Sequence, residues 1–217
     1  MLDKMEEKDI IKTGTTTVGL ICKDGVVLAA DRRATAGHFI ASTKVEKVLQ
    51  ITDDIAVTIA GTVSDIQLVV KLIKAELKLK AIRTGKINTV KEATNLLSGI
   101  VYNNIRKFSL IPGISHFIVG GRDVTGFHIY DLSPDGAIEE IEDFVSSGSG
   151  SVMVYGLLEA AYKKGMAVKD GIELAVKGIN SAIQRDAASG NGVIVYTITD
   201  KGVKKVLDKR LDIKLEA

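Results

Sequence analysis

Apolar and β-branched residues come in short blocks along the amino-terminal part of the chain, and these blocks predict strands. Segments 15–22 and 26–30 flank an Asp-Gly turn, which favours a tight hairpin. Segments 48–51 and 55–60 repeat this pattern around a second polar turn. We therefore expect two β-hairpins, the second of which ends at Gly61.

The periodicity then changes to three- and four-residue steps, which predict a helix between Thr62 or Ser64 and Gly85. A second helix is expected from about Asn88 or Thr89 to Lys107. The remaining predicted elements are strands at 116–119, 126–130 and 137–144, helices at 152–163 and about 168–187, and strands at 193–199 and 203–207.

The order of elements is strands, two helices, strands, two helices and strands. Hairpin turns join most neighbouring strands, so both sheets should be antiparallel. Helices that arrive in pairs suggest one helical layer outside each of two packed sheets, an α+β arrangement in four αββα layers. We find no linker and no internal repeat that would divide the chain, so a single domain is expected.

Charge and cysteine content exclude several classes of function. The net charge is +2, from 29 Lys and Arg against 27 Asp and Glu, which gives no electrostatic case for nucleic acid or a membrane surface. The single cysteine, Cys22, excludes an intramolecular disulfide framework and a four-thiolate zinc site. We find no apolar run near the ~20 residues of a membrane span and no signal-peptide centre. A cytoplasmic protein is therefore expected.

Common catalytic and cofactor motifs are missing from the sequence. His38, His116 and His128 lack metal-ligand spacing with Cys22, so we interpret all three as structural and expect no metal. No G-x-S-x-G elbow is present. The Ser- and Gly-rich segment 146–151 lacks the third glycine of a dinucleotide fingerprint and the Gly-Lys-Ser/Thr of a P-loop. It predicts a tight turn that caps a helix, and no cofactor is expected.

A series of short motifs nevertheless points to one family. Each motif is weak alone, but their order over residues 14 to about 200 resembles the β-type subunit of the 20S proteasome, most closely the archaeal kind. The motifs lie at 14–19 (Gly-Thr-Thr-Thr-Val-Gly), 25–33, 42–47, 58–61, 147–150, 155–159 and 184–190. The resemblance weakens at 83–86, at 103–115 and after about Lys205.

This resemblance implies the N-terminal-nucleophile hydrolase fold and a threonine endopeptidase in which Thr15 is the nucleophile. A threonine hydroxyl is a poor nucleophile and needs a base. Cleavage of the Gly14–Thr15 bond would free an α-amine of reference pKa about 7.7–8.0, which can serve as that base. Residues 1–14 would then be a propeptide removed by self-cleavage, and residues 15–217 the catalytic domain. A glycine at position 14 eases the strained turn that self-cleavage needs.

The resemblance also assigns further site residues. Lys47 would be the cation near the amine, with Asp31 paired to it, whereas their spacing alone favours an ordinary exposed ion pair. A group around the amine and a relay water is implied at Ser149, Asp186 and Ser189. Gly61 would supply an oxyanion-hole N–H, and backbone groups of Thr35 and Gly61 would pair with an extended substrate. The matched P1-pocket positions are Ala34, Val45, Leu49, Ile59, Val63 and Gln67, which favour cleavage after hydrophobic residues.

The partners implied by the family are other β subunits in seven-membered rings, flanking α-subunit rings, a regulatory ATPase and unfolded polypeptide. Two alternatives stay open. The chain could be a structural β subunit that never matures, which the intact Gly14–Thr15 pair argues against. It could also be a bacterial two-component proteasome-like protease, whose chains are typically shorter and lack the full motif context at 147–150 and 184–190.

Overall fold

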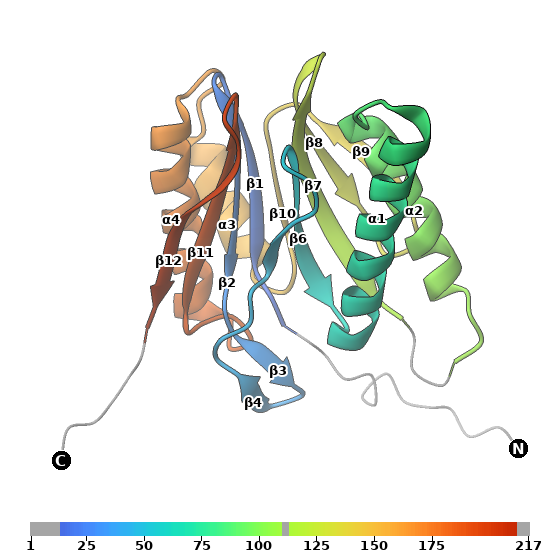
Figure 1. Cartoon of the computed structure of the whole chain (residues 1–217). Coiled ribbons are helices and arrows are strands. Elements are labelled where there is room, and N and C mark those ends of the chain that lie inside the picture. Colours follow the sequence, from blue (N-terminus) through green and yellow to red (C-terminus); the bar gives the residue numbers. More distant parts are fainter. Residues whose placement is uncertain (1–13, 110–112, 212–217) are drawn as a thin grey trace, which may run out of the picture.

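The computed structural model describes residues 14–109 and 113–211, so all of the predicted propeptide except Gly14 lies outside the described residues. Two five-stranded antiparallel sheets face each other, with strand orders β10-β1-β2-β11-β12 and β5-β6-β7-β8-β9. Figure 1 shows α3 and α4 outside the first sheet and α1 and α2 outside the second. The predicted four-layer αββα sandwich is therefore confirmed.

The elements follow in the predicted order. The strands are β1 (Thr17–Cys22), β2 (Gly25–Asp31), β3 (Ala34–Ala36), β4 (Phe39–Ser42), β5 (Val48–Gln50), β6 (Ile55–Gly61), β7 (Ser115–Asp123), β8 (Gly126–Leu132), β9 (Ile138–Ile141), β10 (Phe144–Ser147), β11 (Gly192–Thr199) and β12 (Gly202–Arg210). The helices are α1 (Val63–Thr84), α2 (Val90–Ile105), α3 (Ser151–Ala161) and α4 (Val168–Arg185).

The single strand predicted at 137–144 was wrong. It is two strands in different sheets, because β9 pairs with β8 while β10 pairs with β1. The chain crosses between the sheets at the exposed residues Glu142 and Asp143. The spacing of Ile138, Ile141 and Phe144 does not by itself show that the chain changes sheet between them, because apolar residues recur in the same way in one sheet or two.

The small β3-β4 hairpin was not predicted. Its turn includes Gly37, whose φ of 60° is left-handed, and most of its side chains are at least partly exposed. Without a buried face, the hairpin lacks the apolar alternation by which strands are recognised. It lies at one end of the sandwich in Figure 1, close to where β1 begins.

Three apolar clusters hold the layers together. One lies between the two sheets and includes Leu28 and Ile118. A second joins α1 and α2 to the sheet that contains β6, around Phe117. The third joins α3 and α4 to the other sheet, around Leu158. None of the helices within the described residues is long and apolar enough to cross a membrane.

Local signals set the end of α1 and the start of α2, but not the start of α1 beside Gly61. Gly85 ends α1 in the left-handed conformation, as its position after the last apolar step predicts. Thr89 and Glu92 form a capping box at the start of α2. Thr62 precedes α1, but its side chain makes no capping hydrogen bond. The start of α1 therefore depends on tertiary contacts, among them the Thr62 N–H bond to the Ile114 carbonyl.

Strand directions bring the candidate residues to one end of the molecule. β1 and β11 begin at this end, and β2, which pairs with both, ends there at Asp31. β6 ends there as well, at Gly61, and α1 begins immediately after it. Figure 1 shows these termini at the lower edge of the sandwich, beside β3 and β4. Residues from distant parts of the sequence thus meet at one edge.

Candidate active site

Thr15 lies in the extended segment just before β1 and is 5% exposed. Its hydroxyl donates a hydrogen bond to the Gly14 carbonyl oxygen at 2.7 Å. Its backbone N–H donates to Ser149 Oγ at 3.3 Å. Because Gly14 precedes Thr15 in the full chain, this nitrogen is a peptide amide rather than a free amine. The hydroxyl therefore rests against the carbonyl group of the preceding residue.

Asp31 is fully buried at the end of β2 and accepts four hydrogen bonds. Its Oδ1 accepts from Lys47 Nζ at 2.7 Å and from the Thr16 N–H at 3.0 Å. Its Oδ2 accepts from the N–H groups of Arg33 and Gly190, both at 2.9 Å. Three backbone donors thus fix the carboxylate in one orientation, and that orientation points one oxygen at the lysine.

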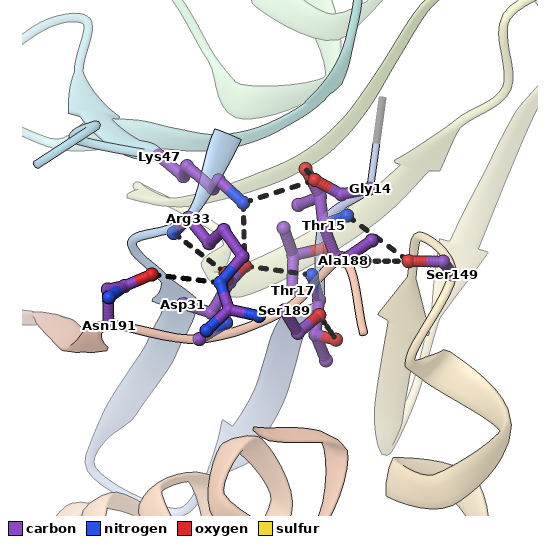
Figure 2. Close-up of polar contacts among 12 residues, drawn as sticks. Gly14, Thr15, Thr17, Asp31, Arg33, Lys47, Ser149, Ala188, Ser189 and Asn191 are labelled. Carbon is purple, nitrogen blue, oxygen red and sulfur yellow. Dashed lines mark hydrogen bonds and ion pairs between the residues drawn. The ribbon is translucent and has the colours of Figure 1, made fainter. Parts of the chain in front are cut away.

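Lys47 is 3% exposed, so the ion pair with Asp31 is buried and not the ordinary exposed pair that spacing alone favours. Burial lowers the pKa of Lys47 below 10.5, and the Asp31 carboxylate opposes this shift. The lysine Nζ also donates to the Gly14 carbonyl oxygen at 3.4 Å. Figure 2 shows Lys47 bridging Asp31 and Gly14. The hydroxyl of Thr15 and the amine of Lys47 thus share one acceptor.

A second group of polar side chains lies on the other side of Thr15. Ser149 Oγ and Ser189 Oγ each donate to Asp186 Oδ2 at 2.6 Å. Ser189 is buried and also bonds the Thr16 hydroxyl at 2.6 Å. Ser149, two residues before α3, and Asp186, at the carboxyl end of α4, therefore meet beside the Thr15 nitrogen.

Close backbone approach explains the glycines of the Ser- and Gly-rich segment. A Cβ on Gly148, whose φ is 92°, would lie 2.0 Å from the Thr15 carbonyl oxygen. A Cβ on Gly150 would lie 2.0 Å from Thr16 Oγ1. The predicted turn before the helix is present after β10, although its N-cap residue, Gly150, makes no side-chain capping hydrogen bond. The two glycines let this turn pack closely against Thr15 and Thr16.

Thr35 and Gly61 border the same space. Thr35 Oγ1 accepts a hydrogen bond from the Gly14 N–H at 3.0 Å, so its side chain holds Gly14 in place. Gly61 has a φ of 127°, and a Cβ there would lie 2.2 Å from the Ile114 carbonyl oxygen. Only glycine fits at this position, where β6 ends beside the cavity that contains Thr15.

A mainly apolar cavity opens beside Gly14 and Thr15. Of the six matched P1 positions, four line this cavity: Ala34, Val45, Ile59 and Val63. Lys47, Gly61 and Ile66 line it as well. The structure does not bring the other two positions to it. Leu49 packs against the α1/α2 cluster, and Gln67 is exposed on α1, where the buried Ile66 takes the inward position instead.

Sequence reasoning gave no role to Arg33. Its Nε donates to Asn191 Oδ1 at 2.8 Å, and its Nη1 donates to the Ala187 carbonyl at 2.7 Å. A Cβ on Gly190 would lie 2.3 Å from the guanidinium. Arg33 therefore ties the loop that carries Asp186 and Ser189 to the end of β2 (Figure 2). The only signal was its place in the 25–33 motif, two residues after Asp31.

Two of the three histidines, His116 and His128, make polar side-chain contacts away from Thr15. His116 Nε2 lies 2.7 Å from Asp131 Oδ1, and His128 Nδ1 lies 3.2 Å from Glu140 Oε1. Residues 14–109 and 113–211 contain no group of three or more His, Cys, Asp and Glu side chains placed to hold a metal ion. Burial, with nearby Asp24 and Asp170, raises the pKa of the Cys22 thiol to about 12, which favours the protonated thiol over the nucleophilic thiolate.

A four-layer αββα sandwich of two antiparallel sheets is the fold of the N-terminal-nucleophile hydrolases. The model of the family described as "Proteasome subunit" matches residues 11–198, and the chain belongs to this family. Its curated relatives bear the name "Proteasome subunit beta", and the chain is accordingly an archaeal-like β subunit of the 20S proteasome.

The similarity to these relatives extends over nearly the full length. The protein from Ferroglobus placidus is 47% identical over 209 residues, which cover 96% of this chain and 97% of the relative. The protein from Archaeoglobus profundus is 46% identical, with 98% and 96% covered. The one from Methanocaldococcus vulcanius is 44% identical, with 91% and 87% covered. Membership of this family implies assembly with other proteasome subunits in rings.

Proposed function

We propose that this β subunit is a threonine endopeptidase whose nucleophile, Thr15, is released by cleavage of the Gly14–Thr15 bond. The observation that carries the proposal is the shared acceptor. The Thr15 hydroxyl and the Lys47 amine both bind the Gly14 carbonyl oxygen, at 2.7 and 3.4 Å. This arrangement places a nucleophile and a hydrogen-bond donor at the same carbonyl group.

Self-cleavage would begin with attack of Thr15 Oγ on the Gly14 carbonyl carbon. The hydroxyl proton is transferred to the Thr15 nitrogen as the C–N bond breaks, while the Lys47 amine donates to the Gly14 carbonyl oxygen and stabilises the negative charge that develops there. An ester joins Gly14 to Thr15 Oγ, and the nitrogen becomes a free amine. Water then hydrolyses the ester, which leaves a carboxylate on Gly14 and restores the threonine hydroxyl.

Peptide hydrolysis would use the same hydroxyl on a second carbonyl group. The freed amine, of reference pKa about 7.7–8.0, accepts or relays the hydroxyl proton near neutral pH. Ser149 already bonds the Thr15 nitrogen, and Asp186 accepts hydrogen bonds from both Ser149 and Ser189. These three side chains would hold a relay water beside the amine. The Gly61 N–H would stabilise the oxyanion. An acyl ester on Thr15 forms and is hydrolysed by water.

The substrate would be unfolded polypeptide, bound as an extended strand beside Thr35 and Gly61. The apolar lining at Ala34, Val45 and Ile59 favours a hydrophobic residue before the cleaved bond. As an archaeal-like β subunit, the chain would form seven-membered rings stacked back to back and capped by α-subunit rings. A regulatory ATPase would feed substrate through the α rings, and the assembly would be cytoplasmic.

The intact mass of the chain after co-assembly with its cognate α subunit tests this proposal. Loss of residues 1–14 together with hydrolysis of a peptide that carries a hydrophobic residue before the cleaved bond is the expected result. Retention of residues 1–14 in a fully assembled particle without hydrolysis would instead establish the alternative, a catalytically silent structural β subunit.

Ile59→Ala should change which hydrophobic residue is preferred. Ile59 lines the cavity beside Thr15, so shortening it deepens the space for the substrate side chain. Because one or two methylenes in an apolar pocket change discrimination by roughly 10–200-fold, kcat/KM for Phe over Val substrates should rise about tenfold. The matched control is Ile87→Ala, since Ile87 is 82% exposed and does not line this cavity. An unchanged Phe/Val ratio would show that this cavity does not bind the substrate side chain.

A further inference from the structure

Ala188 lies where a side chain on Gly14 would have to go. A Cβ built on Gly14 would be 1.7 Å from Ala188 Cβ, 2.9 Å from Ala188 Cα and 3.1 Å from its carbonyl oxygen. Distances below 3.0 Å are not tolerated between such atoms, so one of the two backbone segments would have to move. Figure 2 shows Ala188 close to Gly14 and Thr15.

Neither backbone segment is free to move away. The Gly14 N–H is held by Thr35 Oγ1 at 3.0 Å, and the Gly14 carbonyl is held by Thr15 Oγ1 and Lys47 Nζ. The Ala188 N–H bonds Asp186 Oδ1 at 3.2 Å.

The ends of the Ala188 loop are fixed as well. The Ser189 N–H bonds the Asp186 carbonyl at 3.1 Å, and Gly190 N–H donates to the buried carboxylate of Asp31. Arg33 anchors the Ala187 carbonyl at 2.7 Å. A substituent on Gly14 would therefore displace the Gly14 carbonyl from the Thr15 hydroxyl or disrupt these bonds.

The wall formed by Ala188 is separate from the apolar cavity. The residues that line that cavity include Ala34, Val45 and Ile59 but not Ala188. A side chain on residue 14 would thus point at the 186–190 loop and not into the space proposed for a substrate side chain. The residue before the nucleophile and the residue before a cleaved substrate bond are consequently subject to different steric limits.

We propose that Ala188 is a specificity-determining residue for self-cleavage: its methyl group restricts the position before Thr15 to glycine. This inference rests on the proposed function and deepens it. It explains how one site can require glycine in its own chain and still prefer larger apolar residues in substrates. This steric restriction on position 14 comes from the 186–190 loop, and it adds to any requirement for a backbone conformation that favours glycine there.

A double-mutant cycle on the full chain, co-assembled with its α subunit, tests the inference. The four chains are wild type, Gly14→Ala, Ala188→Gly and the double variant, and the rate of loss of residues 1–14 is followed by intact mass. Displacing the carbonyl by about 1 Å should slow cleavage of Gly14→Ala roughly 10²-fold. The double variant should recover about tenfold over Gly14→Ala, after correction for the effect of Ala188→Gly alone. Recovery is partial because Ala188 Cα stays 2.9 Å from the added carbon.

The matched control is Gly14→Ala combined with Ala187→Gly. This change adds the same backbone freedom to the same loop but removes an exposed methyl that is not among the nearest contacts of Gly14. It should give no recovery. Equal recovery in both double variants, or recovery in neither, would overturn the role of Ala188. The proposed function would still stand if wild-type chains lost residues 1–14 in a Thr15-dependent manner. Absence of wild-type cleavage would overturn both.

A second experiment distinguishes a role in self-cleavage from a general structural role of the Ala188 methyl group. The single variants Ala188→Gly and Ala187→Gly are also prepared with Thr15 as the first residue, released from an amino-terminal fusion. Position 14 is then absent, so Ala188→Gly and Ala187→Gly should alter peptide hydrolysis to the same extent. A much larger loss for Ala188→Gly would show that the methyl serves the folded site in general and would contradict a role confined to residue 14.

Discussion

A chain that carries Thr15→Ala is expected to keep residues 1–14 after assembly and to hydrolyse no peptide. The substitution removes the only hydroxyl that bonds the Gly14 carbonyl oxygen in the described structure, and with it the atom that would attack. Loss of the nucleophile in a serine hydrolase lowers kcat roughly 10⁶-fold, and a loss of that order is expected here. Intact mass and hydrolysis of a fluorogenic peptide measure the two effects.

Thr15→Ser is the matched variant, because it keeps the hydroxyl and removes only a methyl group. It should retain cleavage of the Gly14–Thr15 bond and measurable hydrolysis, at reduced rates, since the serine side chain has more rotamers available than the β-branched threonine. If the alanine chain lost residues 1–14 as fast as wild type, another protease would be responsible, and Thr15 would not be the self-cleaving residue.

Asp31→Asn is expected to have the second largest effect, on stability as well as on activity. The Asp31 carboxylate accepts hydrogen bonds from three backbone N–H groups and from the Lys47 amine. In asparagine an NH₂ group replaces one of the two oxygens, so its N–H donors would face the donors that this oxygen now binds. The substitution would also leave Lys47 buried without its counter-charge. Breaking a buried ion pair costs about 3–5 kcal/mol, so the free energy of unfolding should fall by about that amount.

The decrease in the free energy of unfolding caused by Asp31→Asn should become smaller as the pH rises toward 10.5. Burial already lowers the pKa of Lys47 below 10.5, and without Asp31 its folded pKa falls further while its unfolded pKa stays near that value. A group with a depressed folded pKa binds more protons when unfolded, so stability rises with pH. The difference between wild type and Asp31→Asn should therefore be largest near neutral pH and shrink as the pH approaches 10.5.

Denaturant unfolding of both chains at several pH values measures this difference. Asp53→Asn is the matched control, since Asp53 is an exposed carboxylate in the turn before β6. It should change the free energy of unfolding by less than about 0.5 kcal/mol at every pH. A similar loss in both variants, or a loss in Asp31→Asn that grows with pH, would contradict the assignment of Asp31 as the partner of a buried lysine.

The pattern of apolar residues was sufficient to predict the order of helices and strands and the four layers. Helix signals such as Gly85 and the Thr89–Glu92 capping box act within one turn of chain, so they can be read locally. The β3-β4 hairpin and the break between β9 and β10 could not be predicted. The hairpin lacks a buried face, and the break depends on which sheet each strand joins.

The candidate site was likewise predicted in part from the sequence and in part decided by the tertiary structure. Sequence motifs, through a family resemblance, singled out Thr15, Asp31 and Lys47, but their spacing alone predicted an exposed ion pair. Only the tertiary structure buries that pair and points Lys47 at the Gly14 carbonyl, because β2, β6 and the segment before β1 end at one edge of the sandwich.

The contacts of Gln67, Arg33 and Ala188 could not be predicted from the sequence either. Gln67 was matched to a pocket that the buried Ile66 lines instead, since the rotation of α1 about its axis is set by packing against the sheet. Arg33 and Ala188 act on residues more than 150 positions away in the chain, at Asn191 and Gly14. The sequence by itself determined which residue types are present and the local elements they form. The distances between them were decided by tertiary packing, because contacts between distant segments depend on how the layers close.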